Sequence, residues 1–479
     1  MSDASGARER FDVVVIGAGP AGIVAALRAG DLGARTALIT RGEIGGMAAH
    51  DGPVPVRTLA HAARLIRDAR QLGRYGIAVG EPALDYARLL SRVRAVVDDV
   101  REHAVLGRQL EAADVIVYED AGATRFLDAH TLATERGPRL VADKIVICTG
   151  GVSRRLDVPG FELTATHSDA WSLTSIPASM IVLGAGATGV QVASIFNAFG
   201  TRVDLFQTGA RILAKEDADV SRAVAEAFRR AGMGVHEAFG AVERFEKTSA
   251  GVRMVFGKHG ARDSLEAVLV VAAVGWTANT GALDLANAAV DTDARGFIRV
   301  DAQLRTSARH VFAAGDVTGR LMLVPQALQD GFVAGTNAAR GATSTVGEGV
   351  TPIGSFTDPE YAQVGLTEDS ARATHDVVVT TVRFDETTRT IIDGRTFGFC
   401  KLIVDRRTRT IVGCHVVGER AVEIVQTAAI AMAGGMRVDE LASIPLSFPT
   451  YTGMLGRAAA VASRRLNVDE RRSELTTTP

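Results

Sequence analysis

Cysteine is scarce in this chain of 479 residues. The three that occur, Cys148, Cys400 and Cys414, stand far apart and form no C-x-x-C spacing. Such an arrangement excludes a disulfide framework and a cysteine zinc site. We therefore expect all three to be buried thiols of the core.

Long apolar runs and a dominant charge are also missing. The first residues, MSDASGARER, hold no apolar signal core, and no later stretch is apolar and long enough to span a bilayer. These absences predict a cytoplasmic protein without membrane insertion. The formal net charge of −2 gives no basic surface for nucleic acid.

Glycine is abundant instead. The chain has 50 glycines, 47% hydrophobic residues and 23% charged residues, which is typical of a globular protein rich in βα turns. Its length is too great for one hydrophobic core and predicts about three domains.

The clearest local pattern is FDVVVIGAGPAG, residues 11–22, a buried strand that runs through a glycine turn into a helix. In such a turn Gly17 makes the bend, Gly19 lets the backbone approach a pyrophosphate, and Gly22 lets the helix pack close to the strand. A plain βα turn can show the same pattern, so the motif by itself does not establish a nucleotide site. At the end of the next strand, Thr40 replaces the carboxylate that usually binds the adenosine ribose, and Arg41 comes directly after it.

The pattern restarts at MIVLGAGATG, residues 180–189. Two glycine turns in one chain imply two dinucleotides. Further on, an apolar strand in residues 306–319 delivers Gly315 and Asp316 at its C-terminal end, where open α/β sheets bind ligands.

The last third changes character. Residues 354–418 favour short strands, including the hairpin KLIVDRRTRTIVGCHVVG, followed by a helix over 421–434 and a closing segment over 445–464. We expect an antiparallel sheet with helices on one face that serves as a subunit interface. It shows no phosphate loop and no cluster of titratable groups.

In this order the pieces resemble one family, the class I pyridine nucleotide-disulfide oxidoreductases, which include dihydrolipoamide dehydrogenase, glutathione reductase and mercuric reductase. The resemblance is carried by Gly17-Ala18-Gly19-Pro20-Ala21-Gly22, Gly45-Gly46, Thr149-Gly150, Gly184-Ala185-Gly186-Ala187-Thr188-Gly189, Gly315-Asp316, Phe356-Thr357-Asp358-Pro359-Glu360, Val364-Gly365-Leu366-Thr367 and Phe448-Pro449-Thr450.

The resemblance implies an α/β fold with two Rossmann-like dinucleotide-binding domains, for FAD and NAD(P)H, and a C-terminal α+β domain that builds a homodimer. The expected segments are an FAD-binding domain at 1–160 and 280–350, an NAD(P)-binding domain at 161–279, an interface domain at 351–466 and a tail at 467–479.

The same resemblance implies which residues bind the cofactors. Asp316 is expected to hydrogen-bond the ribityl chain of FAD. The expected FAD residues are Gly17, Gly19, Pro20, Ala21, Gly22, Thr40, Arg41, Gly46, Met47, Thr149, Gly150, Gly315, Asp316, Leu323, Val324 and Pro325. The expected NAD(P)H residues are Gly184, Gly186, Thr188, Gly189, Gln207 and Gly275.

The departures from the family decide the expected chemistry. Two redox cysteines, five positions apart, fall at Ala48 and Pro53, and a catalytic His-Glu pair falls at Phe448 and Gly453. A thiol-disulfide relay needs a thiolate and a second sulfur, so this chemistry is not expected here.

Further departures line the expected flavin and nicotinamide sites. The family's lysine and glutamate become Arg57 and Gln191, and an aromatic residue over the nicotinamide site becomes Ala187. Arg57 would stabilise negative charge on the flavin, or else be a surface residue that caps the following helix. Gln207 replaces the acid that selects NADH, with Arg211 and Lys215 as candidate phosphate ligands, and leaves the choice of nucleotide open.

His50 and Asp51 could relay a proton near the flavin, but the Asp-Gly-Pro sequence favours a turn cap. The predicted catalytic residues are therefore Arg57, Gln191 and Phe448. The predicted function is an FAD-dependent NAD(P)H oxidoreductase that reduces a non-disulfide small-molecule acceptor such as a quinone. The alternatives are a soluble pyridine nucleotide transhydrogenase, an NAD(P)H oxidase, or a non-catalytic flavin- or nucleotide-binding sensor protein.

Overall fold

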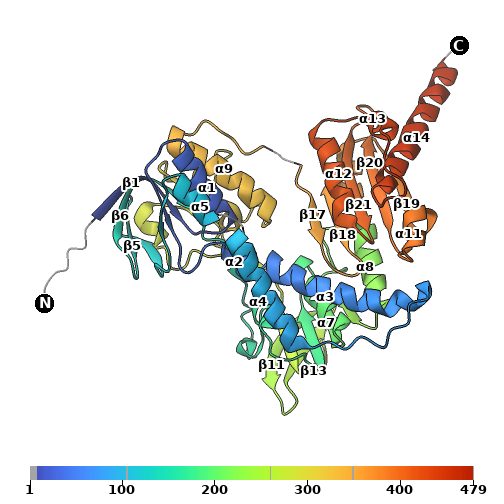
Figure 1. Ribbon diagram of the computed structural model, residues 1–479, viewed down its shortest axis with the longest axis horizontal. Helices are drawn as coiled ribbons and strands as arrows, with labels where there is room; N and C mark the ends of the chain where they lie inside the picture. The colour runs from blue at the N-terminus through green and yellow to red at the C-terminus, as the bar shows by residue number, and fades with distance from the viewer. Residues whose placement is uncertain (1–7, 104–105, 259, 348–349, 478–479) are drawn as a thin grey trace. The chain divides into compact units, whose positions relative to one another are not determined.

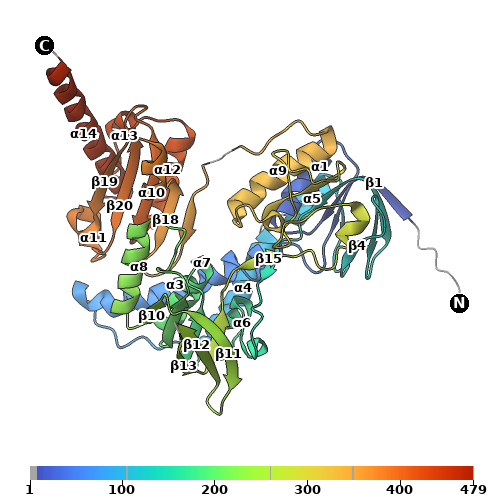
Figure 2. The same cartoon turned by 180° about the vertical axis from the view of Figure 1, so that it is seen from behind.

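The computed structural model describes residues 8–103, 106–258, 260–347 and 350–477. Figures 1 and 2 show the elements from opposite sides. The chain divides into two compact units. Unit 1 comprises Met1–Leu59, Ala87–Arg155 and Gly275–Glu348, and unit 2 comprises Ala60–Tyr86, Leu156–Val274 and Gly349–Pro479.

Unit 1 is built on a mainly parallel sheet. Over the described residues the strand order is β3-β2-β1-β6-β5-β4, with β16 beside β6. Strand β1 runs parallel to β2 and β6, and β16 runs parallel to β6, whereas β5 is antiparallel to its two neighbours. The strands are β1 Arg8–Ile16, β2 Thr36–Ile39, β3 Ile116–Tyr118, β4 Thr124–Phe126, β5 Thr131–Thr134, β6 Arg139–Ile147 and β16 Val311–Ala313.

The C-terminal half of β1, Val13 to Ile16, is buried on both faces, as its apolar run predicts. Val13 and Val15 pack with residues of α1 on one face, while Val14 and Ile16 join the core on the other. Helices α1 (Pro20–Asp31) and α9 (Val324–Arg340) lie side by side over the first face (Figure 1).

Glycines allow this close helix contact. A Cβ atom at Gly331 would lie 2.2 Å from the carbonyl oxygen of Ala21. The other described elements of unit 1 include α2 Gly46–His50, α5 Leu106–Ala112, η3 Leu285–Ala288, η4 Gly315–Thr318 and the antiparallel pair β7 Gly151–Ser153 and β15 Trp276–Ala278. Helices α3 Pro53–Gln71 and α4 Tyr86–His103 begin or end in unit 2.

Unit 2 contains a second parallel sheet, of order β10-β9-β8-β14, and an antiparallel sheet of order β11-β12-β13. Their strands are β8 Ser179–Leu183, β9 Arg202–Gln207, β10 Gly234–Glu237, β11 Ala241–Lys247, β12 Val252–Lys258, β13 Ala261–Ala267 and β14 Leu269–Ala272. The accompanying helices are η1 Leu72–Tyr75, η2 Phe161–Leu163, α6 His167–Trp171, α7 Ala187–Ala198 and α8 Ala218–Arg230.

The C-terminal part of unit 2 is an antiparallel sheet of order β17-β18-β21-β20-β19. The expected hairpin is present as β20 and β21. The strands are β17 Ile353–Ser355, β18 Tyr361–Gly365, β19 Val377–Arg383, β20 Phe399–Asp405 and β21 Ile411–Val417. The helices are α10 Glu368–Thr374, η5 Phe384–Glu386, α11 Thr388–Ile392, α12 Ala421–Ala433, α13 Val438–Ser443 and α14 Gly453–Thr477.

The fold class is therefore the one expected, an α/β chain with two dinucleotide-type sheets and a C-terminal α+β region. Helix α3 begins at Pro53. Proline is favoured in the first turn of a helix, where its missing N–H is not needed. No described helix has the length and apolar character needed to cross a membrane.

Candidate active site

The first glycine turn joins β1 to α1. Gly17 has a φ of +105°, and a Cβ atom there would lie 2.4 Å from the carbonyl oxygen of Cys148. A Cβ atom at Gly22 would lie 1.7 Å from the carbonyl oxygen of Gly17. The fold itself therefore requires glycine at both positions.

Gly19 differs from these two glycines. It has extended backbone angles, and a Cβ atom there would meet nothing within 4 Å. The fold gives no reason for glycine at this position, which lies at the N-terminus of α1. A pyrophosphate that approaches the backbone N–H groups would give one.

Asp316 lies in η4, directly after β16. Burial and the nearby carboxyl group of Asp330 raise the pKa of Asp316 to about 6. Asp330, on α9, is fully buried, and its Oδ1 accepts a hydrogen bond from Gln326 Nε2 at 2.7 Å. Its Oδ2 has no partner among the described residues.

A buried oxygen without a partner is costly, so this carboxyl pair suits a ligand that carries hydroxyl groups, as FAD does. Sequence reasoning missed Asp330. Its only signal was an acid four residues after Gln326 on the apolar face of a helix.

Other expected FAD residues lie on the same edge of unit 1. Thr149 and Gly150 follow β6, and the Thr149 Oγ1 is buried without a partner in the described chain. Leu323, Val324 and Pro325 form the N-terminus of α9. Thr40 is buried at the end of β2, with its Oγ1 3.4 Å from the carbonyl oxygen of Glu43, and Arg41 beside it is exposed.

The second glycine turn, between β8 and α7, repeats the first. A Cβ atom at Gly184 would lie 2.3 Å from the carbonyl oxygen of Ala273, and one at Gly189 would lie 1.8 Å from that of Gly184. Gly186 is open, with nothing within 4 Å. Two turns of equal construction thus stand at the starts of two helices.

Comparison with known families explains this repetition. The family model described as pyridine nucleotide-disulphide oxidoreductase matches residues 11–331, and the dimerisation domain of the same family matches residues 351–459. The chain belongs to the pyridine nucleotide-disulphide oxidoreductase family. Members of this family are flavoprotein oxidoreductases that bind FAD and NAD(P)H.

Individual relatives can be aligned with nearly the whole of this chain. A dihydrolipoyl dehydrogenase from Bacillus subtilis is 29% identical over 94% of this chain and 98% of its own. A mercuric reductase from Lysinibacillus sphaericus is 28% identical over 94% of this chain and 82% of its own. The solved structure of the HOCl-induced flavoprotein disulfide reductase RclA from Escherichia coli superposes with a TM-score of 0.83 at 25% identity, covering 94% of this chain and 100% of RclA.

The two positions expected for the redox cysteines of the oxidoreductase family lie on consecutive helices. Ala48 is in α2 and Pro53 is the first residue of α3. Between them the Nε2 atom of His50 lies 3.0 Å from the carbonyl oxygen of Ile44, which fits the cap of a turn. Arg57 lies one turn into α3 with an exposed side chain.

The nucleotide-facing departures lie in unit 2. Ala187 is exposed in the first turn of α7, and Gln191 donates from Nε2 to the Ala187 carbonyl oxygen at 3.1 Å. Gln207 ends β9, and its Oε1 accepts from the backbone N–H of Ala185 at 3.1 Å. Because an N–H only donates, the amide oxygen must face Ala185, so the NH₂ group is the part of the Gln207 side chain that is left to donate.

Arg211 is bonded within its own loop. Its Nη2 donates to the carbonyl oxygens of Ala214 and Glu216, at 3.1 and 3.0 Å, and so braces the segment that links β9 to α8. Lys215 is exposed. Gly275, after β14, has a φ of +109°.

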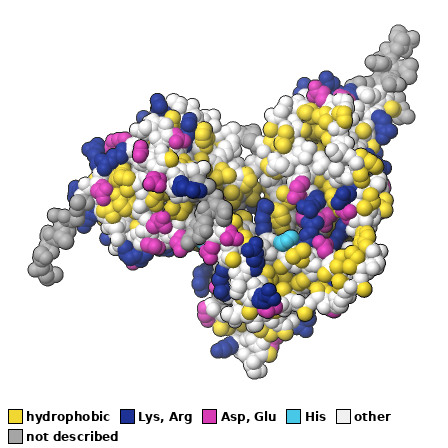
Figure 3. Space-filling model, viewed as in Figure 1, with side chains coloured by type: hydrophobic (Ala, Val, Ile, Leu, Met, Phe, Trp, Pro, Cys, Tyr) yellow, Lys and Arg dark blue, Asp and Glu magenta, His cyan; other side chains and the backbone are white. Residues whose placement is uncertain are grey.

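Phe448 is 82% exposed, in the segment before α14. Other large apolar side chains of the C-terminal region are also exposed, among them Ile430 at 66% and Ile391 at 57%. Figure 3 shows hydrophobic side chains at the surface of this region.

Proposed function

We propose that this protein is an FAD-dependent NAD(P)H oxidoreductase that reduces a non-disulfide small-molecule acceptor of the quinone class. The observation that carries the proposal is the absence of usable sulfur. Positions 48 and 53 hold Ala and Pro, and all three cysteines of the chain are buried and free.

None of the three thiols can replace the missing pair. Cys148 packs under the first glycine turn, and burial raises the pKa of its thiol, which disfavours the nucleophilic thiolate. Cys400 and Cys414 are fully buried in the C-terminal core. A disulfide substrate would thus find no protein thiolate to attack it.

The residues of unit 1 fit FAD. Gly19 leaves the N-terminus of α1 open, and the carboxyl groups of Asp316 and Asp330 supply acceptors for hydroxyl groups. FAD, when bound, supplies the redox chemistry, taking a hydride from NAD(P)H and passing electrons to the acceptor. The protein contributes binding, orientation and charge.

Arg57 supplies a permanent positive charge at the position expected beside the flavin. Met47, Ala48 and Pro53 make the expected acceptor side apolar, because none of them can ionise. An apolar, flat acceptor such as a quinone suits that surface better than a charged one.

We further propose a homodimer formed through the C-terminal region, in which Phe448 of the partner subunit completes the acceptor side. The match to the family's dimerisation domain and the exposure of Phe448, Ile430 and Ile391 support this arrangement. Sedimentation equilibrium should give the mass of a dimer. The mass of a monomer at micromolar protein concentration would refute the proposed dimer.

One observation favours a second candidate, a pyridine nucleotide transhydrogenase. Such an enzyme must accept both NADH and NADPH. Gln207 presents an uncharged donor, which neither repels a 2′-phosphate nor excludes a 2′-hydroxyl.

Anaerobic mixing tests the proposal. We expect the yellow protein to be bleached by NADH or NADPH, and its colour to return on addition of a quinone but not of lipoamide or glutathione disulfide. Return of colour with NAD(P)⁺ alone would favour the transhydrogenase. Protein that stays yellow with both nucleotides would refute every oxidoreductase function.

Arg57→Ala tests the catalytic assignment within that experiment. Removal of the charge should slow bleaching or lower the flavin potential while FAD stays bound. Unchanged kinetics and potential would remove Arg57 from the site.

A further inference from the structure

The C-terminal sheet carries a row of polar side chains across its middle. In the strand register, Gln363 of β18 stands opposite His415 of β21, and His415 stands opposite Lys401 of β20. Residues paired in this way point to the same face of a sheet. His415 and Lys401 are almost completely buried, so they need polar partners within the protein.

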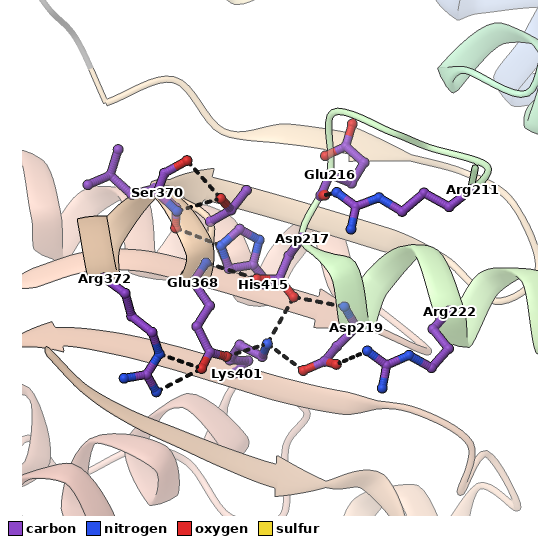
Figure 4. Close-up of polar contacts among 12 residues, drawn as sticks. Arg211, Glu216, Asp217, Asp219, Arg222, Glu368, Ser370, Arg372, Lys401 and His415 are labelled. Carbon is purple, nitrogen blue, oxygen red and sulfur yellow. Dashed lines mark hydrogen bonds and ion pairs between the residues drawn. The ribbon is translucent and has the colours of Figure 1, made fainter. Parts of the chain in front are cut away.

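Three carboxylates surround Lys401 (Figure 4). Its Nζ lies 2.9 Å from Asp217 Oδ1, 2.5 Å from Asp219 Oδ2 and 2.8 Å from Glu368 Oε2. The side chains of Lys401 and Asp217 are only 3% and 2% exposed. Burial would lower the pKa of Lys401, but its hydrogen bonds to the three acids raise it, so the ammonium stays charged.

Asp217 fixes the start of α8. It is the N-cap residue of that helix, and its Oδ1 accepts from the backbone N–H of Asp219 at 3.0 Å. Its Oδ2 accepts from the backbone N–H of Glu368 at 3.0 Å. Lys401 therefore acts on the residue at which the β9–α8 loop becomes helix.

The loop before Asp217, residues 208–216, is bound to the second glycine turn. Arg211 braces the loop through the carbonyl oxygens of Ala214 and Glu216. The backbone N–H of Leu213 donates to the carbonyl oxygen of Ala185 at 2.8 Å. Gln207, at the start of the loop, accepts from the N–H of the same Ala185.

A continuous chain of bonds thus runs from Lys401, through Asp217 and the loop, to the residue between Gly184 and Gly186. We propose that Lys401 is a positioning residue for the nicotinamide nucleotide. By neutralising Asp217 it holds the β9–α8 loop and the glycine turn in the shape that receives the adenosine half. The inference rests on the proposed binding of NAD(P)H at this turn.

The electrostatics predict what removal of the lysine does. Asp217, Asp219 and Glu368 all lie within 2.9 Å of one nitrogen, so without the ammonium they repel one another at close range. Asp217 must then take up a proton or leave its buried site. If it leaves, the first turn of α8 and the attached loop move with it.

Lys401→Met tests the proposal, because methionine keeps an unbranched apolar stem without the charge. The readouts are the dissociation constants of NADH and of 5′-AMP, measured calorimetrically at pH 8 and pH 6, and the FAD content. We expect both constants to rise about tenfold at pH 8 while FAD stays bound. The defect should shrink at pH 6, because without the Lys401 ammonium burial raises the pKa of Asp217 and favours its neutral form. Lys401→Arg should restore part of the affinity.

Arg372→Met is the matched control. Arg372 pairs with Glu368 at 2.8 Å in the same cluster but is 55% exposed, so we expect native constants. Native constants in Lys401→Met, or a loss that is equal at both pH values and not relieved by arginine, would overturn the proposal.

If Lys401→Met does not fold, the double variant Lys401→Met/Asp217→Asn replaces it, since it removes the buried negative charge as well. A dissociation constant for 5′-AMP near the native value in the double variant supports the charge-coupled positioning. A dissociation constant raised about tenfold or more in a folded double variant refutes it. Failure of the proposed function looks different, because the native protein itself would then bind no nucleotide.

Discussion

Substitution of the two open glycines, Gly19 and Gly186, by alanine tests the two nucleotide sites independently of each other. A Cβ atom at Gly19 or at Gly186 meets nothing within 4 Å, and both residues have extended backbone angles that alanine also adopts. The folding cost of each change is the loss of a better N-cap, partly offset by a less flexible unfolded chain. We therefore expect stability to change by less than about 1 kcal/mol.

Ligand binding should respond far more strongly. The methyl group would occupy the side of the turn on which a pyrophosphate approaches the backbone N–H groups. Loss of one charge-assisted hydrogen bond costs about 1.5–3 kcal/mol, which is roughly a 10- to 100-fold loss of affinity. Gly19→Ala should yield folded but FAD-depleted protein, whereas Gly186→Ala should yield yellow protein that NAD(P)H bleaches poorly.

Gly22→Ala provides the contrast, because its Cβ atom would lie 1.7 Å from the carbonyl oxygen of Gly17. That clash should cost more than about 3 kcal/mol and lower the melting temperature whether or not FAD is present. Melting curves, FAD absorbance and stopped-flow bleaching read out the three variants. A fully FAD-loaded Gly19→Ala protein, or a Gly186→Ala protein bleached at the native rate, would refute the assignment of the two turns.

Three further outcomes are expected at the site. Gln207→Glu should weaken NADPH binding relative to NADH binding by about tenfold or more, because a carboxylate repels the 2′-phosphate. An unchanged ratio of the two dissociation constants would show that Gln207 does not face the ribose. The double change Ala48→Cys/Pro53→Cys should not create lipoamide reductase activity, because Phe448 still provides no proton; rapid turnover would contradict that account. Asp316→Asn should stabilise the FAD-free protein more at pH 8 than at pH 4.5. The folded pKa of Asp316, about 6, lies above the unfolded value, so the native protein loses stability as the pH rises through 6 and the asparagine variant does not. Equal shifts of the melting temperature at both pH values would contradict this account.

The fold can be predicted closely from the sequence because the glycines of its two turns are required by nearby backbone contacts. A side chain at any of four glycines would clash with backbone a few residues away or on the neighbouring strand, namely Gly17, Gly22, Gly184 and Gly189. The glycine motif alone therefore predicts both strand–turn–helix units. The apolar run of β1 likewise predicts burial on both faces.

The buried polar groups could not be predicted in the same way. The expectation that the last third holds no cluster of titratable groups was wrong, because Lys401, Glu368 and Arg372 lie together there. Asp217 and Asp219, far away in the sequence, complete the cluster. Each of these residues has an ordinary surface role in its local context. Only the strand register and the docking of the β9–α8 loop bring them together.

The burial of every thiol has a consequence for how the protein tolerates chemical attack. Alkylating agents, arsenicals and mercurials need an accessible sulfhydryl, and native Cys148, Cys400 and Cys414 offer none. Treatment with excess N-ethylmaleimide should therefore leave the mass of the folded protein unchanged. An enzyme that depends on an exposed dithiol would be modified under the same treatment, whereas the folded form of this chain offers electrophiles no accessible sulfur.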